Sequence, residues 1–362
     1  MKIIVISSTI FPVSSRGLVG YGGLEQIALQ CAKGLAEKGH QVSLVTPDGS
    51  SCDGVEIIPT GPPGQHDERE AYGGYPEHKE GEIVRRRAHA GYWQHLLSMD
   101  AIIDHSWQKW AYMLKAEGTL KVPILGVMHA PVNTMYGKLP PVEKPCVVCI
   151  SKDQGEHFKA LFNQEVRVAY NGIDLDFYKP VDVPRTNRFL FLARFSSIKG
   201  ADLAIDACRN AGLGLDLVGD TSITHEPDYY YQCKSKCDGK QIRMVGPANR
   251  GECVYWFSQA HCFLHPNMRF REPFGLAPVE AMACGLPVIA WDNGAMRETI
   301  HPDCGGLVNS FDGLVKAIEV MTRGDVDRMR PRCREWASQF SVQKMIDRYE
   351  SLCVEAIEGG GW

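Results

Sequence analysis

The chain has 362 residues, of which 44% are hydrophobic and 23% charged, and its formal net charge is −4. This length exceeds what one hydrophobic core usually supports, and the composition is that of a globular protein, so we expect two domains. The slightly acidic balance provides no global attraction to nucleic acid or to anionic lipid, which argues against a nucleic-acid partner.

Neither a membrane span nor a secretory leader is predicted. No apolar stretch approaches the roughly 20 residues that cross a bilayer, and the first residues lack the long apolar segment of a signal peptide. The 13 cysteines are scattered through apolar runs, as is typical of small buried side chains in a reducing compartment. Cys146 and Cys149 have a zinc-like spacing but no second pair, which favours a core role. We therefore expect a soluble, cytoplasmic protein.

Short apolar runs alternate with amphipathic stretches in the first half of the chain. Strands are predicted at 2–7, 41–46, 55–59, 101–105, 123–129 and 146–151. A helix between the first two has its apolar face at Leu24, Ile27, Ala28, Cys31 and Leu35, with Gly39 beyond its end. Residues 61–78, rich in Gly, Pro and charge, are typical of a long surface loop.

The same alternation restarts after a turn-rich, proline-bearing stretch at 171–187, which we interpret as a linker. Further strands are predicted at 189–194, 213–220, 242–246, 262–266, 286–292 and 305–310. The fold class is therefore α/β, with doubly wound sheets in a domain at 1–170 and another at 188–340. A last helix within 341–362 is expected to cross back to the first domain. Ligands of such sheets bind at the carboxyl ends of the strands, in a cleft.

Residues 271–290 contain the most informative motif. Pro278 suits a first helical turn, and Gly285 would end this helix before the next strand. Backbone N–H groups of Phe274, Gly275 and Leu276 would be free at the helix start, where the helix dipole also favours a phosphate. Glu272 precedes the helix and Glu280 lies one to two turns inside it, so both can face opposite ends of one ligand about 10 Å long.

The two glutamates with seven residues between them resemble the signature of family 4 glycosyltransferases. The resemblance covers nearly the whole chain and implies the GT-B fold, with two Rossmann-like domains facing each other across a cleft. It implies retaining transfer of a hexose-type sugar from a nucleoside diphosphate, UDP being favoured, to an acceptor hydroxyl. Glu272 would face the donor sugar and Glu280 would bond the ribose hydroxyls. Either residue alone would equally suit a helix cap or a solvent-facing position.

Arg194 at the end of a predicted strand and Lys199 just before a helix can both reach the carboxyl edge of the second sheet. Two fixed cations can offset the charge of a diphosphate without a metal and stabilise it as a leaving group. The resemblance implies this catalytic role for both residues. Without this resemblance, a basic pair at a helix start would be interpreted as solvent-exposed residues with no functional role.

Glycines precede the first helix at Gly22 and Gly23, where the backbone can approach a phosphate closely. Asp48, at the end of the second strand, would suit a nicotinamide dinucleotide, but the third glycine of that fingerprint would fall at Glu25. A nicotinamide dehydrogenase is therefore disfavoured. The resemblance instead implies that Gly22 and Gly23 cap the donor diphosphate.

Two histidines end predicted strands of the first domain, and each is expected to face the cleft. The resemblance implies that His105 lies beside the reacting sugar, whereas His129 matches a more structural position, on the possible acceptor side. It also implies that the backbone of Gly246, Pro247 and Ala248 contacts the nucleobase. Both histidines would otherwise be hydrogen-bonded structural residues.

No metal and no cofactor beyond the nucleotide-sugar co-substrate are expected. The acidic pairs Asp174/Asp176 and Asp325/Asp327 do not follow strands at the cleft, and the basic run 85–89 favours a solvated helix face over a lipid-headgroup patch. Asp220 and Arg297 depart from the family pattern, where glycine and proline are common. The sequence does not distinguish between a small molecule, a glycan and a glycolipid as the acceptor. It is also compatible with peripheral contact with a membrane.

Two further alternatives share this fold type. A nucleotide-sugar epimerase would release nucleotide without an acceptor, and a noncatalytic homologue would bind nucleotide without consuming it. The presence of Glu272, Arg194 and Lys199 disfavours the noncatalytic protein.

Overall fold

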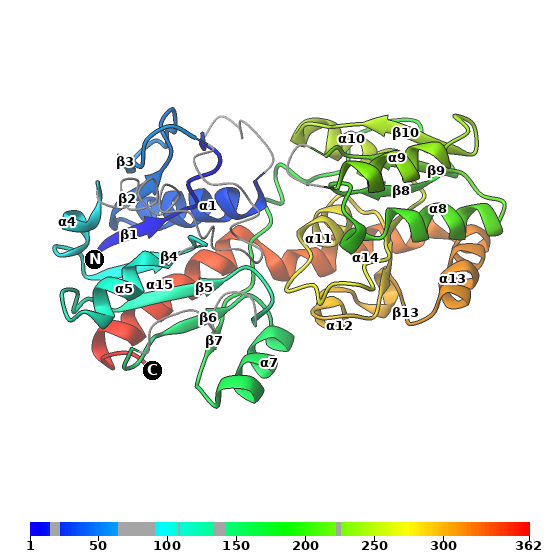
Figure 1. Cartoon of the computed structure of the whole chain (residues 1–362). Coiled ribbons are helices and arrows are strands. Elements are labelled where there is room, and N and C mark those ends of the chain that lie inside the picture. The colour runs from blue at the N-terminus through cyan, green and yellow to red at the C-terminus, as the bar shows by residue number, and fades with distance from the viewer. Residues whose placement is uncertain (15–21, 64–90, 108, 133–141, 222–225) are drawn as a thin grey trace. The chain divides into compact units, whose positions relative to one another are not determined.

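The computed structural model describes residues 1–14, 22–63, 91–107, 109–132, 142–221 and 226–362. The chain divides into two compact units (Figure 1). The first unit comprises Met1–Gly172 together with Val342–Trp362, and the second comprises Ile173–Ser341. Each unit is built on one parallel sheet, as expected for an α/β chain of alternating strands and helices.

The sheet of the first unit has the order β3-β2-β1-β4-β5-β6-β7 and is parallel throughout. Its strands are β1 (Lys2–Ile6), β2 (Gln41–Thr46), β3 (Glu56–Pro59), β4 (Ala101–Asp104), β5 (Ile124–Met128), β6 (Val147–Cys149) and β7 (Arg167–Val168). All six predicted strands are confirmed. The seventh, β7, is missing from the prediction because two residues show no periodicity.

Helices of the described part of the first unit are α1 (Gly23–Glu37), α4 (Trp93–Leu96), α5 (Trp110–Ala116), α7 (Lys152–Phe162) and α15 (Val342–Glu358). The predicted apolar face of α1 is buried, and Gly39 follows the helix with a φ of 89°. Figure 1 shows α15 in red, packed against α1 in blue. Gly34 on α1 lies so close to Ile346 on α15 that a Cβ at position 34 would fall 1.9 Å from Cδ1 of that isoleucine.

The sheet of the second unit has the order β10-β9-β8-β11-β12-β13 and is also parallel. Its strands are β8 (Phe189–Leu192), β9 (Leu215–Val218), β10 (Ile242–Gly246), β11 (Cys262–His265), β12 (Val288–Trp291) and β13 (Gly305–Val308). The central strands β8 and β11 are fully buried, as their unbroken apolar sequences predict for a sheet covered on both faces. All six predicted strands are confirmed.

The helices of the second unit alternate with these strands. They are the 3₁₀ turns η2 (Ser197–Lys199), η3 (Pro302–Cys304) and η4 (Ser338–Phe340), and the helices α8 (Ala201–Asn210), α9 (Pro227–Ser235), α10 (Arg250–Gln259), α11 (Leu276–Ala283), α12 (Met296–Thr299), α13 (Phe311–Arg323) and α14 (Val326–Ala337). Phe189, Phe191 and Phe195 pack with apolar side chains of α8 and α13 in the core. The apolar residues that recur with strand and helix periodicity in the sequence therefore form a continuous core in this unit.

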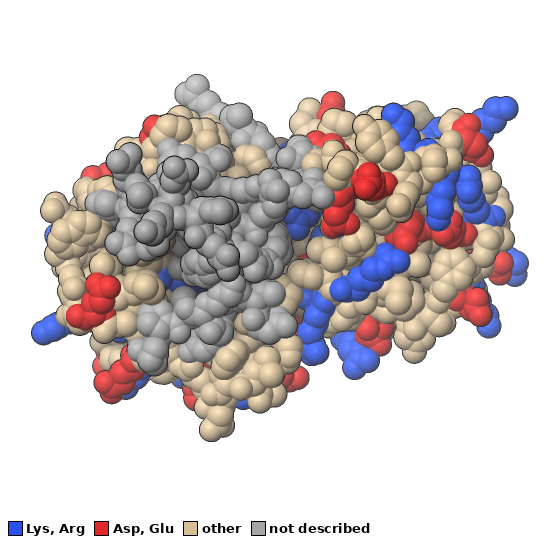
Figure 2. Space-filling model, in the orientation of Figure 1, with Lys and Arg blue, Asp and Glu red and all other residues tan. Residues whose placement is uncertain are grey.

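All 13 cysteines are free thiols, and most of them are buried. Burial raises the pKa of Cys149 to about 12, which keeps this thiol protonated and suits the core role predicted for it. Within the described residues, no helix combines the length and the apolar character needed to cross a bilayer. On the face of the second unit drawn in Figure 2, basic and acidic side chains are interspersed, in line with the small net charge.

The close approach of α1 and α15 makes position 34 sensitive to size. We expect Gly34→Val to lower the free energy of unfolding by about 1–3 kcal/mol, because the added side chain overlaps Ile346 in a packed contact. Denaturant unfolding of the purified variant measures this loss. In an Ile346→Ala background the same substitution should cost less; an equal cost in both backgrounds would show that the two residues are not in contact.

Candidate active site

The strand order of the second unit places a crevice at one defined position. From β8 the chain proceeds outward through β9 and β10, and from β11 it proceeds in the opposite direction through β12 and β13. Loops that leave the carboxyl ends of β8 and β11 therefore diverge, and open α/β sheets bind ligands at such a switch point. Lys199 lies in the segment after β8 and Glu272 in the loop after β11.

Lys199 and Glu272 are in direct contact. Nζ of Lys199 lies 2.8 Å from Oε2 of Glu272, and it also lies 5.4 Å from the centre of the Phe270 ring. The next residue, Gly200, has a φ of 77°, and a Cβ there would fall 2.4 Å from the carbonyl oxygen of Pro266. A glycine at this position therefore allows the two loops to approach closely enough for the ion pair to form.

Glu272 is a buried carboxylate with several donors around it. Its Oε2 accepts a hydrogen bond from Nδ2 of Asn267 at 2.7 Å, and Nε2 of His265 lies 3.5 Å away. Burial raises the pKa of Glu272, but the charge of Lys199 and the contact with His265 outweigh it and hold the pKa well below its usual range. Glu272 is thus an anion at neutral pH, held beside a cation.

His265 and Asn267 are site residues that the sequence analysis missed. His265 ends β11 and Asn267 follows it by two residues, so both project from the carboxyl edge of a central strand. The signal was available, because polar residues directly after a buried strand are typical of ligand-binding edges. The dipeptide His265-Pro266 was interpreted only as the end of the strand.

The start of α11 lies where the sequence predicts it, and phosphate binding there stays a prediction. Gly275 is the N-cap residue of the helix, with a φ of 83°, and it has no side chain to cap the N–H groups of the first turn. A Cβ at Gly275 would fall 2.5 Å from Cε of Met296. Leu276 begins the helix, whereas Phe274 is buried with its ring 5.6 Å from that of Phe340. The backbone of this segment therefore offers anion-binding donors, while the Phe274 side chain serves packing.

Glu280 lies on α11 in a polar setting of its own. Tyr178 hydrogen-bonds with its carboxyl group, and Arg250 supplies a nearby positive charge. The guanidinium of Arg250 stacks over Phe177, 4.4 Å from the ring centre. Burial raises the pKa of Glu280, and the two neighbours only partly offset this rise. Tyr178 and Arg250 were not predicted, because their contact with Glu280 depends on segments far apart in sequence.

Arg194 lies two residues beyond the end of β8, near Glu226. Burial raises the pKa of the Glu226 carboxyl, but hydrogen bonds from Ser196 and Ser197 and the charge of Arg194 outweigh it, so the pKa is lowered. The structure thus joins Lys199 to Glu272 and places Arg194 next to a different carboxylate. The catalytic role of Arg194 stays a prediction.

The segment that is predicted to contact the nucleobase lies at the end of β10 and just after it. Gly246 ends this strand with a φ of 106°, and its carbonyl oxygen accepts a hydrogen bond from the N–H of Gly219 at 2.8 Å. Pro247 is exposed, Ala248 is half-buried, and Asn249 then begins α10 with a capping box. The loops after β9 and β10 are therefore tied together at the same edge of the sheet as Lys199. Base recognition by this segment stays a prediction.

Two predicted histidines of the first unit meet each other. Because β4 and β5 are neighbours, His105 and His129 emerge side by side, and Nδ1 of His105 lies 2.8 Å from Nε2 of His129. His105 is completely buried. Burial lowers the pKa of both rings, that of His129 to about 3, so the pair is neutral at physiological pH. Contact of either residue with a substrate stays a prediction.

A buried lysine beside these histidines was also missed. Nζ of Lys109 donates to the carbonyl oxygens of Asp104 at 2.7 Å and of Ser106 at 2.6 Å. Burial lowers the pKa of Lys109 to about 8, although Asp104 counteracts part of this effect. Lys109 therefore braces the turn that carries His105. In the sequence, Lys109 is a single lysine flanked by tryptophan residues, and no motif marks it as part of a site.

Two glycines stand at the start of α1. Gly22 caps α1 and Gly23 is its first residue, as predicted. The carboxyl group of Glu25 folds back toward Gly22 and accepts a hydrogen bond from Ser8. The basic run 85–89 lies outside the described residues. Within the described part, no cluster of three or more His, Cys, Asp or Glu side chains has the arrangement of a metal site.

The neutral histidine pair predicts how stability depends on pH. An unfolded histidine binds a proton near pH 6.5, whereas folded His129 does so only near pH 3. The unfolded state therefore holds more protons in this range, and the free energy of unfolding should fall as the pH drops from about 6.5 toward 3.

Replacing His129 with Gln should flatten this pH dependence, which denaturant titrations at successive pH values will measure. The matched control is His95→Gln, because His95 is exposed on α4. It should retain the slope of the wild type. An unchanged slope in His129→Gln would contradict the assignment of a neutral, buried ring.

Comparison with known proteins agrees with this architecture over almost the entire chain. The model of the family described as Glycosyltransferase Family 4 matches residues 21–177, and that described as Glycosyl transferases group 1 matches residues 176–338. D-inositol 3-phosphate glycosyltransferase 1 of Catenulispora acidiphila is 24% identical in an alignment that spans 99% of this chain and 97% of that protein.

Solved structures show the same fold. Sucrose-phosphate synthase of Thermosynechococcus elongatus superposes with a TM-score of 0.77 at 19% identity, covering 99% of this chain and 100% of that one. The Anabaena protein HepE in complex with UDP-glucose superposes with a TM-score of 0.71 at 18% identity, covering 99% of this chain and 100% of that one. Both units of the chain are therefore represented in each of these proteins.

Proposed function

Because the chain belongs to the family 4 glycosyltransferases of the GT-B fold, we propose that it moves a hexose-type sugar from a nucleoside diphosphate to an acceptor hydroxyl. The observation that carries this proposal is the contact of Lys199 with Glu272 at the switch point of the second sheet. UDP is the favoured nucleotide, since the similar HepE structures contain UDP or UDP-glucose. The acceptor is a small molecule, a glycan or a glycolipid.

The donor diphosphate would lie on positive groups of the second unit. Lys199 and Arg194 supply two cations, and the start of α11 at Gly275 supplies backbone donors. These fixed positive groups balance the diphosphate charge, so we propose that catalysis requires no metal. Glu280 would accept hydrogen bonds from the ribose hydroxyls. Because its pKa is raised, Glu280 loses its charge at a higher pH than an ordinary glutamate would.

Glu272 would bind the donor sugar as an anion. Its lowered pKa means that it accepts hydrogen bonds from sugar hydroxyls at neutral pH and does not donate a proton. Asn267 and His265 hold the carboxylate, and Lys199 contacts the same oxygen. A donor with its diphosphate on Lys199 and its sugar on Glu272 would therefore use two groups that are already preorganised against each other.

We propose that the transfer retains the anomeric configuration. The acceptor hydroxyl would attack from the side of the leaving group, its proton would pass to a phosphate oxygen, and Lys199 would stabilise the departing diphosphate. Glu272 and His105 would orient the sugar, and Gly22 and Gly23 would approach the diphosphate from the first unit.

The free thiols of the chain support a cytoplasmic location, because such thiols persist in a reducing compartment.

A panel of radiolabelled sugar nucleotides, each incubated with and without cell-extract acceptors, tests the function. We expect one donor, with UDP as its nucleotide, to release nucleoside diphosphate and to transfer label to an acceptor fraction. Nucleotide release that never requires an acceptor would instead indicate an epimerase. No turnover of any donor by folded protein would contradict the proposal.

The role of Lys199 predicts a specific loss of rate. Lys199→Ala should lower kcat/KM by about a hundredfold, because it removes a charge-assisted contact worth about 2–3 kcal/mol in the transition state. Lys316→Ala is the matched control, since Lys316 is an exposed lysine on α13, and it should turn over at the rate of the wild type. Equal rates for both variants would remove Lys199 from the mechanism.

A further inference from the structure

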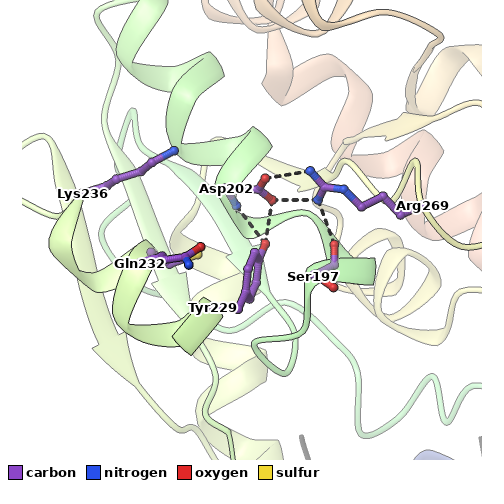
Figure 3. A pocket seen from close by; sticks show the side chains of 7 residues that line it. Ser197, Asp202, Tyr229, Gln232, Lys236 and Arg269 are labelled. Carbon is purple, nitrogen blue, oxygen red and sulfur yellow. Dashed lines mark hydrogen bonds and ion pairs between the residues drawn. The ribbon is translucent and has the colours of Figure 1, made fainter. Parts of the chain in front are cut away.

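A second set of polar contacts joins the two loops that carry Lys199 and Glu272. A cavity of about 340 Å³ opens in the second unit, lined in part by Ser197, Asp202, Tyr229, Gln232, Lys236 and Arg269 (Figure 3). Arg269, Asp202 and Tyr229 point toward one another at its wall, as the dashed lines in Figure 3 show. We call these three residues the loop clamp.

Arg269 makes the central contacts of the loop clamp. Its Nη1 and Nη2 donate to the two oxygens of Asp202 at 3.0 and 2.8 Å, and Nη1 also donates to the carbonyl oxygen of Ser197 at 2.9 Å. The hydroxyl of Tyr229 donates to Oδ1 of Asp202 at 2.7 Å and accepts from the backbone N–H of Asp202 at 3.1 Å. One guanidinium therefore holds both a side chain and the backbone of the opposite segment.

The loop clamp lies close in sequence to both members of the proposed catalytic pair. Arg269 precedes Glu272 by three residues in the loop after β11. Ser197 precedes Lys199 by two residues in η2, and Asp202 follows Lys199 by three residues in α8. The same two segments are thus joined twice, by the ion pair of the site and by the clamp.

The backbone of η2 is also fixed from its other side. Glu226 accepts hydrogen bonds from the hydroxyl of Ser196 at 2.6 Å and from the N–H of Ser197 at 2.8 Å. The N–H of Ser197 is therefore held by Glu226, and its carbonyl by Arg269. Both backbone polar groups of Ser197, its N–H and its carbonyl, are therefore hydrogen-bonded, which fixes the turn that ends in Lys199.

We propose that the loop clamp positions Lys199 and Glu272 for catalysis, with Arg269, Asp202 and Tyr229 acting as positioning residues that do not touch the substrate. The inference rests on the proposed function, because it concerns the pair to which that function assigns the chemistry. A misplacement of about 1 Å in a catalytic group can cost about a hundredfold in rate, so a clamp of this kind acts on turnover.

The geometry indicates that arginine is required at position 269. An ion pair near the surface contributes little to stability by itself, and the side chains of Arg269 and Asp202 are 39% and 26% exposed. The planar guanidinium nevertheless reaches two carboxylate oxygens and a carbonyl at once, which an ammonium cannot reproduce. The contribution of the clamp is therefore expected in the rate of transfer more than in global stability.

A double-mutant cycle on kcat tests the positioning role. Arg269→Gln and Arg269→Lys should each lower kcat about 10- to 100-fold, while the Kd of the nucleoside diphosphate changes less than threefold. In the Lys199→Ala background, Arg269→Gln should lower kcat less than threefold, because the Lys199–Glu272 contact that the clamp positions is gone. Equal losses in both backgrounds would overturn the proposal. Arg332→Gln, which removes an exposed arginine–glutamate pair on α14, should leave kcat unchanged.

Amide hydrogen exchange of the apo protein tests the clamp without turnover. Arg269→Gln should accelerate exchange in residues 195–200 and 266–275, whereas Arg332→Gln should not. Tyr229→Phe, which removes one hydroxyl, should give a smaller increase and serves if Arg269→Gln does not fold. Unchanged exchange in both segments would overturn the clamp. A failure of every donor in the turnover assay, with the exchange increase intact, would instead contradict the proposed function alone.

Discussion

The second unit is organised around a buried carboxylate, that of Glu272, which must be paired to remain charged. Lys199, Asn267 and His265 surround it; Lys199 comes from the segment after β8, and the other two come from the end of β11 and the loop that follows it. Removing one partner of such a pair leaves an uncompensated charge in a poorly solvated site, which is strongly destabilising. The two loops are therefore constrained to approach each other, and the contact of Gly200 with Pro266 is what permits that approach. Parallel pairing of β8 with β11 supplies the frame.

The strands, the helix starts and much of the candidate site followed from local sequence. Buried apolar runs identified twelve of the thirteen strands that the described residues form, and Gly275 before Leu276 indicated the helix start. Local sequence could not predict which distant side chains contact each other. Tyr178 reaches Glu280 across about 100 residues of chain, and Arg269 meets Asp202 across 67. Such contacts depend on the order of strands in the sheet, which no single segment encodes.

A carboxylate of the second unit and two histidines of the first unit differ in charge. In the second unit, Glu272 is paired with Lys199 and remains ionised, as its lowered pKa shows. In the first, burial lowers the pKa of His105 and His129 and holds both rings neutral. A neutral imidazole can donate or accept a hydrogen bond but carries no charge to a phosphate. The charged site therefore suits the proposed diphosphate binding, whereas the neutral histidine pair offers only uncharged hydrogen bonds.

Calorimetric titration with UDP, GDP and ADP examines the diphosphate site most directly, because it requires neither the sugar nor the acceptor. We predict saturable binding of at least one of these nucleotides, UDP being favoured, to the wild-type protein. Lys199→Ala should weaken that binding at least tenfold, in keeping with the loss of one charge-assisted contact. Absence of binding heat for all three nucleotides with folded protein, or full affinity in Lys199→Ala, would contradict a diphosphate site at these loops.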